Sequence, residues 1–157
     1  MATIRHFKDL RAWQQCRVVR MAIRALVKNW PAEEKYRLVD QIIRSSRGPT
    51  AHISEGYGRF YEKENIRYCR TARGSLYETQ DHLITACDDG IITEQIMQTH
   101  FDQVEQAITT VNGYIKYLKG LSVSKGGGVA EPTTKYGMPK SSTTESPGPE
   151  NPLEADI

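Results

Sequence analysis

A three- and four-residue spacing of apolar side chains runs through most of this chain, and no other feature of the sequence restricts the fold as strongly. The clearest case is the stretch Val104, Ile108, Val111, Ile115 and Leu118. Because an α-helix has about 3.6 residues per turn, this spacing places the apolar side chains on one face. The polar–apolar alternation of strands and the Asn-Gly turns of hairpins are absent. The sequence therefore predicts an all-α protein.

Glycine and proline residues indicate where the helices begin and end. We expect helices over about residues 6–28, 31–58, 59–90 and 93–119. Pro31 suits the first turn of the second helix, and Gly90 suits a left-handed cap after the third. Thr93 is an expected N-cap, and Gly120 is the expected end of the last helix. Four helices of this length with short connections predict an antiparallel up-down-up-down four-helix bundle.

The stretch "RSSRGPTAHISEGYGR" interrupts the second expected helix. Pro49 removes a backbone hydrogen bond, so we expect the helix to be kinked or split there. Gly56 and Gly58 resemble a phosphate-binding loop only superficially, because no strand precedes them and no Lys-Ser/Thr pair follows. They are interpreted as a helix-ending corner.

Composition divides the chain into residues 1–121, the predicted bundle, and residues 122–157, a predicted disordered tail rich in Pro, Gly, Ser and Thr. The tail holds five of the seven prolines and almost no large apolar residues, so it cannot bury enough surface to offset its ordering entropy. Residues 1–121 contain 18 Lys and Arg against 14 Asp and Glu, and the tail contains 3 against 5. The predicted bundle is therefore mildly basic.

Several functional classes are disfavoured by the sequence. No apolar run is long enough to span a bilayer, and three cysteines without metal-ligand spacing are typical of reduced intracellular thiols. We therefore expect a cytoplasmic protein that makes no membrane contact. None of the four histidines belongs to an HExxH sequence, and no Glu-x-x-His occurs, as a di-iron bundle would require. We expect no enzymatic activity, no cofactor and no metal.

Basic residues recur on the predicted outer faces of the helices and suggest nucleic-acid binding. Tyrosine and phenylalanine are interleaved with them, and guanidinium groups with exposed aromatic rings suit RNA, which offers phosphates and unpaired bases. The alternative is an ordinary solvated helix face, because Glu62, Glu64, Glu78 and Asp81 stand at helical spacing from several of these cations. The candidates are Arg17, Arg20, Arg24, Arg44, Arg59, Lys63, Arg67, Arg70 and Arg73.

Three large apolar residues lie outside the main apolar stripe of the first helix if that helix is straight. They are Leu10, Trp13 and Trp30. Apolar groups outside a core are candidates for a subunit interface. The alternative, which the sequence leaves open, is that they cap the bundle ends within one subunit.

Motifs spread along the chain resemble those of the 23S ribosomal RNA intervening-sequence protein family, whose members are called four-helix bundle proteins. They are "FKDLRAWQQC", "YRLVDQIIRSS", "AHISEGYGR", "KENIRYCRTARGSLYETQDHL" and "DDGIIT". The resemblance covers about residues 7–120 in order and leaves the tail uncovered. The combination of F-x-D-L-x-x-W, E-G-x-G-R and G-S-L-x-E carries its specificity.

The resemblance implies a bacterial four-helix bundle without established catalytic activity and a homo-oligomer, with a ring-shaped pentamer as the expected form. A related branch accompanies reverse transcriptases of diversity-generating retroelements, which implies retroelement RNA or a reverse transcriptase as a partner. It also implies a structural network at the corner containing Glu55, Gly56, Gly58 and Glu78, in which the two acids contact Arg44, Arg59 and Arg67.

Two functional hypotheses follow. The leading one is a non-enzymatic homo-oligomer that binds ribosomal or retroelement RNA through arginine-rich helix faces. The second is a protein-interaction adaptor or scaffold, for a reverse transcriptase for example, that does not contact nucleic acid. A steep loss of binding with salt would distinguish RNA binding from adaptor binding, because phosphate contacts release counterions.

Overall fold

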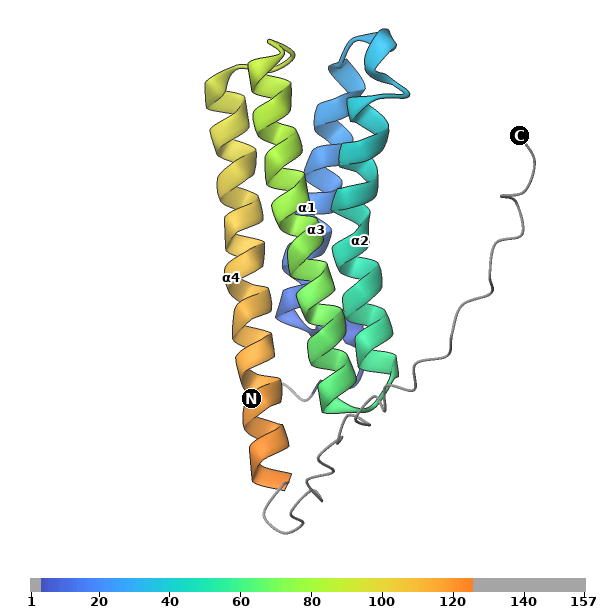
Figure 1. The fold of residues 1–157 in the computed structure, drawn as a ribbon, viewed down its shortest axis with the longest axis vertical. Helices are drawn as coiled ribbons and strands as arrows, with labels where there is room; N and C mark the ends of the chain where they lie inside the picture. Colours follow the sequence, from blue (N-terminus) through green and yellow to red (C-terminus); the bar gives the residue numbers. More distant parts are fainter. Residues whose placement is uncertain (1–3, 126–157) are drawn as a thin grey trace, which may run out of the picture. The chain divides into compact units, whose positions relative to one another are not determined.

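The computed structural model describes residues 4–125, and within them every regular element is helical. The four main helices are α1 (Arg11–Leu26), α2 (Leu38–Gly58), α3 (Glu62–Asp88) and α4 (Glu94–Lys125). Each packs against its neighbour in the chain, and α1 also packs against α4, so α1 and α3 lie diagonally across the bundle (Figure 1). The predicted all-α, up-down-up-down four-helix bundle is confirmed.

The core consists of the apolar stripes of all four helices. Cys16, Val19 and Ile23 of α1 are buried, as are all five residues of the stripe that begins at Val104. On α3, six residues at the same three- and four-residue spacing are all buried: Cys69, Ala72, Leu76, Thr79, Leu83 and Ala86. The helical period therefore identified the core-facing residues of α3 and α4 correctly.

The ends of the first helix differ from the expectation of one helix over residues 6–28. α1 is flanked by two 3₁₀ turns, Phe7–Asp9 and Val27–Asn29. Leu10 has an extended backbone with φ −70° and ψ 121°, which separates the first of these turns from α1. The first turn is capped from both sides: His6 Nδ1 accepts a hydrogen bond from the Lys8 amide, and Asp9 Oδ2 accepts one from the His6 amide.

The second helix begins later than predicted and is not split. Pro31 precedes a 3₁₀ turn, Ala32–Glu34, and α2 begins at Leu38. α2 then runs as one helix through Pro49, which is buried. At the α2–α3 corner, the left-handed residue is Phe60, with φ 60°, and not a glycine. Gly56 lies inside α2 and is buried, so its role is the close approach of α3 rather than the turn.

The connection between α3 and α4 was predicted correctly from local sequence. Gly90 has φ 70° and its amide donates to the Cys87 carbonyl at 3.0 Å, which ends α3. The Thr93 hydroxyl accepts from the Ile96 amide at 3.3 Å and caps α4. α4 continues past Gly120 to Lys125, so the predicted end at Gly120 was wrong, and residues 122–125 of the predicted tail are helical. The remainder of that tail lies outside the described residues.

Candidate nucleic-acid interface

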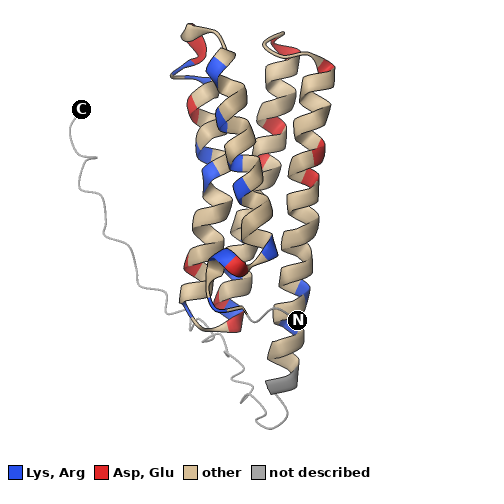
Figure 2. Cartoon of the chain, turned by 180° about the vertical axis from the view of Figure 1, so that it is seen from behind, with Lys and Arg blue, Asp and Glu red and all other residues tan. Residues whose placement is uncertain are grey.

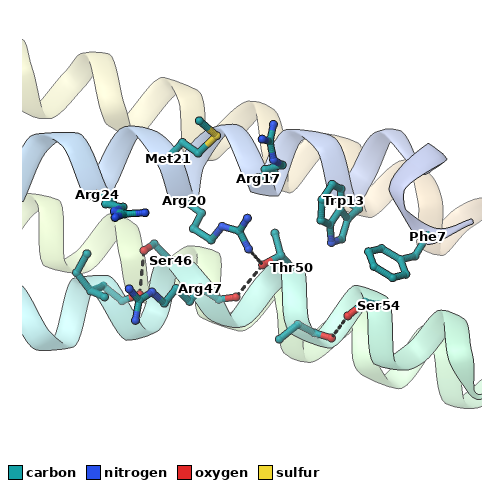
Figure 3. A pocket seen from close by; sticks show the side chains of 12 residues that line it. Phe7, Trp13, Arg17, Arg20, Met21, Arg24, Ser46, Arg47, Thr50 and Ser54 are labelled. Carbon is teal, nitrogen blue, oxygen red and sulfur yellow. Dashed lines mark hydrogen bonds between the residues drawn. The ribbon is translucent and has the colours of Figure 1, made fainter.

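A groove of about 670 Å³ lies between α1 and α2 and collects arginine side chains from both helices (Figure 3). Arg17, Arg20 and Arg24 come from successive turns of α1, and Arg47 comes from α2. No Asp or Glu is among the lining residues. The remaining lining residues are Phe7, Trp13, Met21, Ile43, Ser46, Thr50, Ala51 and Ser54.

The Thr50 hydroxyl on α2 orients one of these arginines. Arg20 Nη1 donates to Thr50 Oγ1 at 3.0 Å, and the Thr50 hydroxyl donates to the Arg47 carbonyl at 3.0 Å (Figure 3). The Ser46 and Ser54 hydroxyls likewise donate to backbone carbonyls three residues earlier. Because these hydroxyl hydrogens are already used within α2, the guanidinium groups are the donors that the groove presents to an anion.

None of the four groove arginines forms a salt bridge within residues 4–125, and Arg20 is the one that donates to a hydroxyl. Arg17, Arg24 and Arg47 are exposed and have no carboxylate partner there. An arginine presents five N–H donors in a planar arrangement that matches phosphate or carboxylate oxygens. The groove is thus a concave cationic surface whose charge is not neutralised by the neighbouring protein.

Two aromatic rings occupy one end of the groove. Phe7 and Trp13 are both half-buried, and their ring centroids lie 5.4 Å apart in an edge-to-face arrangement (Figure 3). The indole N–H of Trp13 has no hydrogen-bond partner among the described residues and is not among the buried unpaired groups. The groove therefore combines cations along its length with an aromatic surface at one end.

Charge is distributed unevenly between the two halves of the bundle. Residues 4–61, which contain α1 and α2, hold twelve Lys and Arg against five Asp and Glu, whereas residues 62–125 hold seven against nine. Figure 2 shows the basic residues gathered on α1 and α2, and acidic residues near the turn that joins α3 to α4. The cationic groove lies in the basic half.

The remaining candidate cations do not join the groove. Lys63, Arg67 and Arg70 lie on α3, which is diagonal to α1. Arg73 donates to the Asn112 side chain of α4 at 2.8 Å, and Arg44 faces Asp40 at 3.4 Å. The sequence placed nine cations in one set, and the structure separates them into the groove and several other locations.

The corner contains a compact polar network built around Glu55. Glu55 Oε1 accepts hydrogen bonds from Arg59 Nη2 at 2.9 Å and from the Tyr68 hydroxyl at 2.8 Å. Arg59 and Arg67 both lie over the Tyr68 ring, with guanidinium carbons 5.6 and 5.3 Å from its centroid. The hydrogen bonds from Arg59 and Tyr68 lower the pKa of Glu55 and favour its charged form.

Two members of the predicted network are elsewhere. Glu78 Oε1 lies 3.6 Å from Nε2 of His82, which is one turn further along α3. Arg44 pairs with Asp40 rather than with an acid at the corner. Gly58 ends α2 and has open space around it, while Gly56 contacts Asn65 and Tyr68 closely. The network therefore contains Glu55, Arg59, Tyr68 and Arg67, and it does not contain Glu78 or Arg44.

Two of the three interface candidates are buried within the subunit. Leu10 is 3% exposed and Trp30 is 9% exposed, and both belong to the core cluster. The extended backbone of both residues turns them away from the straight-helix positions that the sequence prediction assumed. Trp13 is half-buried and lines the groove. The alternative of capping within one subunit thus holds for Leu10 and Trp30.

A different apolar surface is exposed beside the α2–α3 corner. Phe60 is 87% exposed and Tyr61 is 71% exposed, and both line a second cavity of about 260 Å³ together with Tyr117 of α4. We call Phe60, Tyr61 and Tyr117 the aromatic end of the bundle. The sequence suggested tyrosine and phenylalanine in general as RNA-stacking residues and did not indicate that these three rings are exposed on one surface.

Three observations on the described residues concern metal binding, thiol reactivity and membrane insertion. Within residues 4–125 no three His, Cys, Asp or Glu side chains are placed to hold a metal ion. Burial raises the pKa of the Cys16 and Cys69 thiols to about 12, which keeps them protonated and disfavours a nucleophilic role. In the same part of the chain no helix has the length and apolar content to span a membrane.

Arg47 and the hydroxyl stripe of α2 were missed as site residues. Ser46, Thr50 and Ser54 are spaced four residues apart, and Arg47 is next to the first of them. This spacing places the three hydroxyls on one helix face, which was the signal available in the sequence. What the spacing could not show is that this face lies opposite Arg17, Arg20 and Arg24.

Comparison with protein-family models matches residues 8–113, about two thirds of the chain, to the family described as 23S rRNA-intervening sequence protein. No curated protein matches the chain. The matched residues include both helices of the groove.

Proposed function

The chain belongs to the 23S rRNA-intervening sequence protein family, and on this basis we propose that it is a non-enzymatic protein that associates with RNA through the α1–α2 groove. The observation that carries the proposal is the set of four arginines, without any carboxylate, that lines the groove. Guanidinium groups bind phosphate by paired, charge-assisted hydrogen bonds. The family description makes ribosomal RNA the first partner to test, and the resemblance makes retroelement RNA the second.

The charge distribution supports this proposal at longer range. The α1–α2 half of the bundle has an excess of seven basic residues, twelve against five, while the other half has an excess of two acidic residues. Such asymmetry orients a polyanion toward the basic half before contact is made. An RNA would therefore meet the groove rather than the exposed side of α3.

Self-association is a further part of the proposal. The aromatic end exposes Phe60 and Tyr61 almost fully, and exposed apolar surface beside a cavity is typical of a protein contact. A ring of subunits would repeat the groove several times and convert a weak RNA contact into a multivalent one. The pentamer implied by the resemblance is the expected form, and its mass is measurable by light scattering.

The same aromatic end favours a second function. A protein adaptor, for a reverse transcriptase for example, would use Phe60, Tyr61 and Tyr117 as its contact surface and would leave the groove empty. Binding to such a partner would change little with salt, because apolar contacts release few counterions. RNA binding and adaptor binding are therefore separable in one titration series.

The test is fluorescence anisotropy with a labelled fragment of 23S ribosomal RNA at about 50 and 200 mM salt. Arg17→Gln/Arg24→Gln removes two groove cations. Lys116→Gln/Lys119→Gln removes the same charge from exposed positions on α4 and is the matched control. Arg67→Gln/Arg70→Gln tests the exposed side of α3.

We expect the groove variant to bind more weakly and to reduce the slope of log K against log salt by about 1.4 to 1.8, which corresponds to two lost phosphate contacts. The α4 control should change the slope much less. If the α3 variant loses binding while the groove variant does not, the location in the groove is wrong. If the intact protein binds no RNA at either salt concentration, the RNA proposal fails and the adaptor function is retained.

A further inference from the structure

Phosphate binding alone does not explain why two aromatic rings lie at one end of the α1–α2 groove. Phe7 and Trp13 form a half-buried pair beside the arginines, and Trp13 presents an unpaired indole N–H there. Phosphate contacts need only cations, whereas aromatic rings contribute to RNA binding by stacking on bases. We propose, on the basis of the function proposed above, that the groove binds an unpaired RNA segment, with phosphates on the arginines and a base on Trp13.

Base accessibility is the first argument for an unpaired segment. In an A-form duplex each base face is covered by its neighbours in the stack, and the major groove is too deep and narrow for side chains to read. A half-buried ring such as Trp13 therefore cannot reach a base face in a duplex. It can stack only on a base that has left the helix, in a loop, a bulge or a free strand.

The dimensions of the groove are the second argument. Arg17 and Arg24 are seven residues apart, so their Cα atoms are separated by roughly 10 Å along α1. The groove volume, about 670 Å³, lies in the range of sites that hold one small ligand. The groove thus fits one or a few nucleotides and is not a surface on which a long duplex would lie.

The placement of donors gives the third argument. The hydroxyls of Ser46, Thr50 and Ser54 donate to backbone carbonyls of α2, so the guanidinium groups supply the donors for phosphate. Thr50 holds Arg20 by a 3.0 Å hydrogen bond, while Arg17 and Arg24 remain free of carboxylates within the described residues. An extended segment would place its backbone along the arginines and one of its bases on the Phe7–Trp13 pair.

The experiment compares three RNAs that carry the same sequence and are labelled at the same end. They are an unstructured strand, the same strand annealed to its complement, and a hairpin that carries the same sequence in its loop. Anisotropy gives the affinity of the full chain for each RNA. Tryptophan fluorescence gives a second signal, because the chain has two tryptophans and Trp30 is buried in the core.

We expect the strand and the loop to bind at least about tenfold more tightly than the duplex, and to quench tryptophan fluorescence, which the duplex does not. Trp13→Leu should lower the affinity for the unpaired RNAs about tenfold or more and leave duplex binding unchanged. Trp13→Phe retains a ring and should retain most of the binding, but the quenching should disappear because only Trp30 remains. Tyr77→Leu, an exposed aromatic position on α3, is the matched control and should change neither signal.

The possible failures are distinguishable. If strand and duplex bind equally and both depend on Arg17 and Arg24, RNA binding through the groove stands and the preference for unpaired RNA is refuted. If Trp13→Leu, with unchanged circular dichroism, binds the strand as the wild type does, stacking on Trp13 is refuted. If no RNA binds in any form, the proposed function itself fails.

Discussion

Adding a single methyl group at Gly56 tests how closely α2 and α3 pack. Gly56 is buried inside α2, and a Cβ atom built on it would lie 2.8 Å from Tyr68 Cβ and 2.8 Å from Asn65 Oδ1. Ordinary carbon–carbon contacts lie at about 3.5–4.0 Å, so the two helices must separate locally by about 1 Å to accept alanine. Asn65 also donates to the Tyr114 hydroxyl at 3.0 Å, and this hydrogen bond crosses to α4.

The expected magnitude follows from three terms. Overpacking of a closely packed site costs about 1–3 kcal/mol. Disturbing the Asn65–Tyr114 hydrogen bond costs about 1 kcal/mol more. The higher helix propensity of alanine returns about 1 kcal/mol. The free energy of unfolding of Gly56→Ala should therefore fall by about 2 kcal/mol.

The assay is urea unfolding followed by circular dichroism, at one protein concentration for all variants because self-association would shift the midpoint. Gly74→Ala is the matched control. Gly74 is an exposed glycine within α3 whose added Cβ would meet nothing within 4 Å. The free energy of unfolding of Gly74→Ala should rise by about 0.5–1 kcal/mol, the usual gain at an open helical site. If Gly56→Ala is stabilised as much as Gly74→Ala, the close α2–α3 contact is refuted.

Three further predictions concern thiols, backbone strain and pH. Cys16 and Cys69, with pKa values raised to about 12, should be at most about one part in ten thousand thiolate at pH 8, so a disulfide reagent should titrate only Cys87 rapidly in the native protein. All three thiols should react in denaturant, and two rapid equivalents in the native state would contradict the burial. Phe60→Asn should raise the unfolding free energy of the dissociated subunit by about 0.5–1 kcal/mol, because asparagine tolerates the left-handed φ of 60° better than phenylalanine does. The same variant should weaken self-association, which light scattering measures. No change in either quantity would argue against both the strain and the contact surface. The lowered pKa of Glu55 means that its ion pair stabilises the fold above the ordinary glutamate pKa, and that this contribution is lost as the pH falls through the lowered value. The difference in urea midpoint between wild type and Glu55→Gln should therefore be larger at pH 7 than at pH 3, and an equal difference would show that the Glu55 charge contributes nothing.

The helical architecture of this chain was determined by its sequence, because helical period and caps depend on residues a few positions apart. The buried residues of α3 follow the helical period, and Gly90 and Thr93 act as the caps that their chemistry predicts. Gly120 was misjudged because its cost of about 1 kcal/mol is small compared with continued packing. Leu121, just beyond it, packs against the core and extends α4.

Long-range placement was decided only by the tertiary structure. Leu10 appeared to lie outside the apolar stripe, but an extended residue before α1 turns it into the core. A helical wheel gives the side of α1 that carries Arg17 and Arg24 and the side of α2 that carries Thr50. It does not give the neighbour that each side faces. That pairing depends on how all four helices bury their stripes together, and it is this packing that brings the arginines, the hydroxyl stripe and Trp13 into one groove.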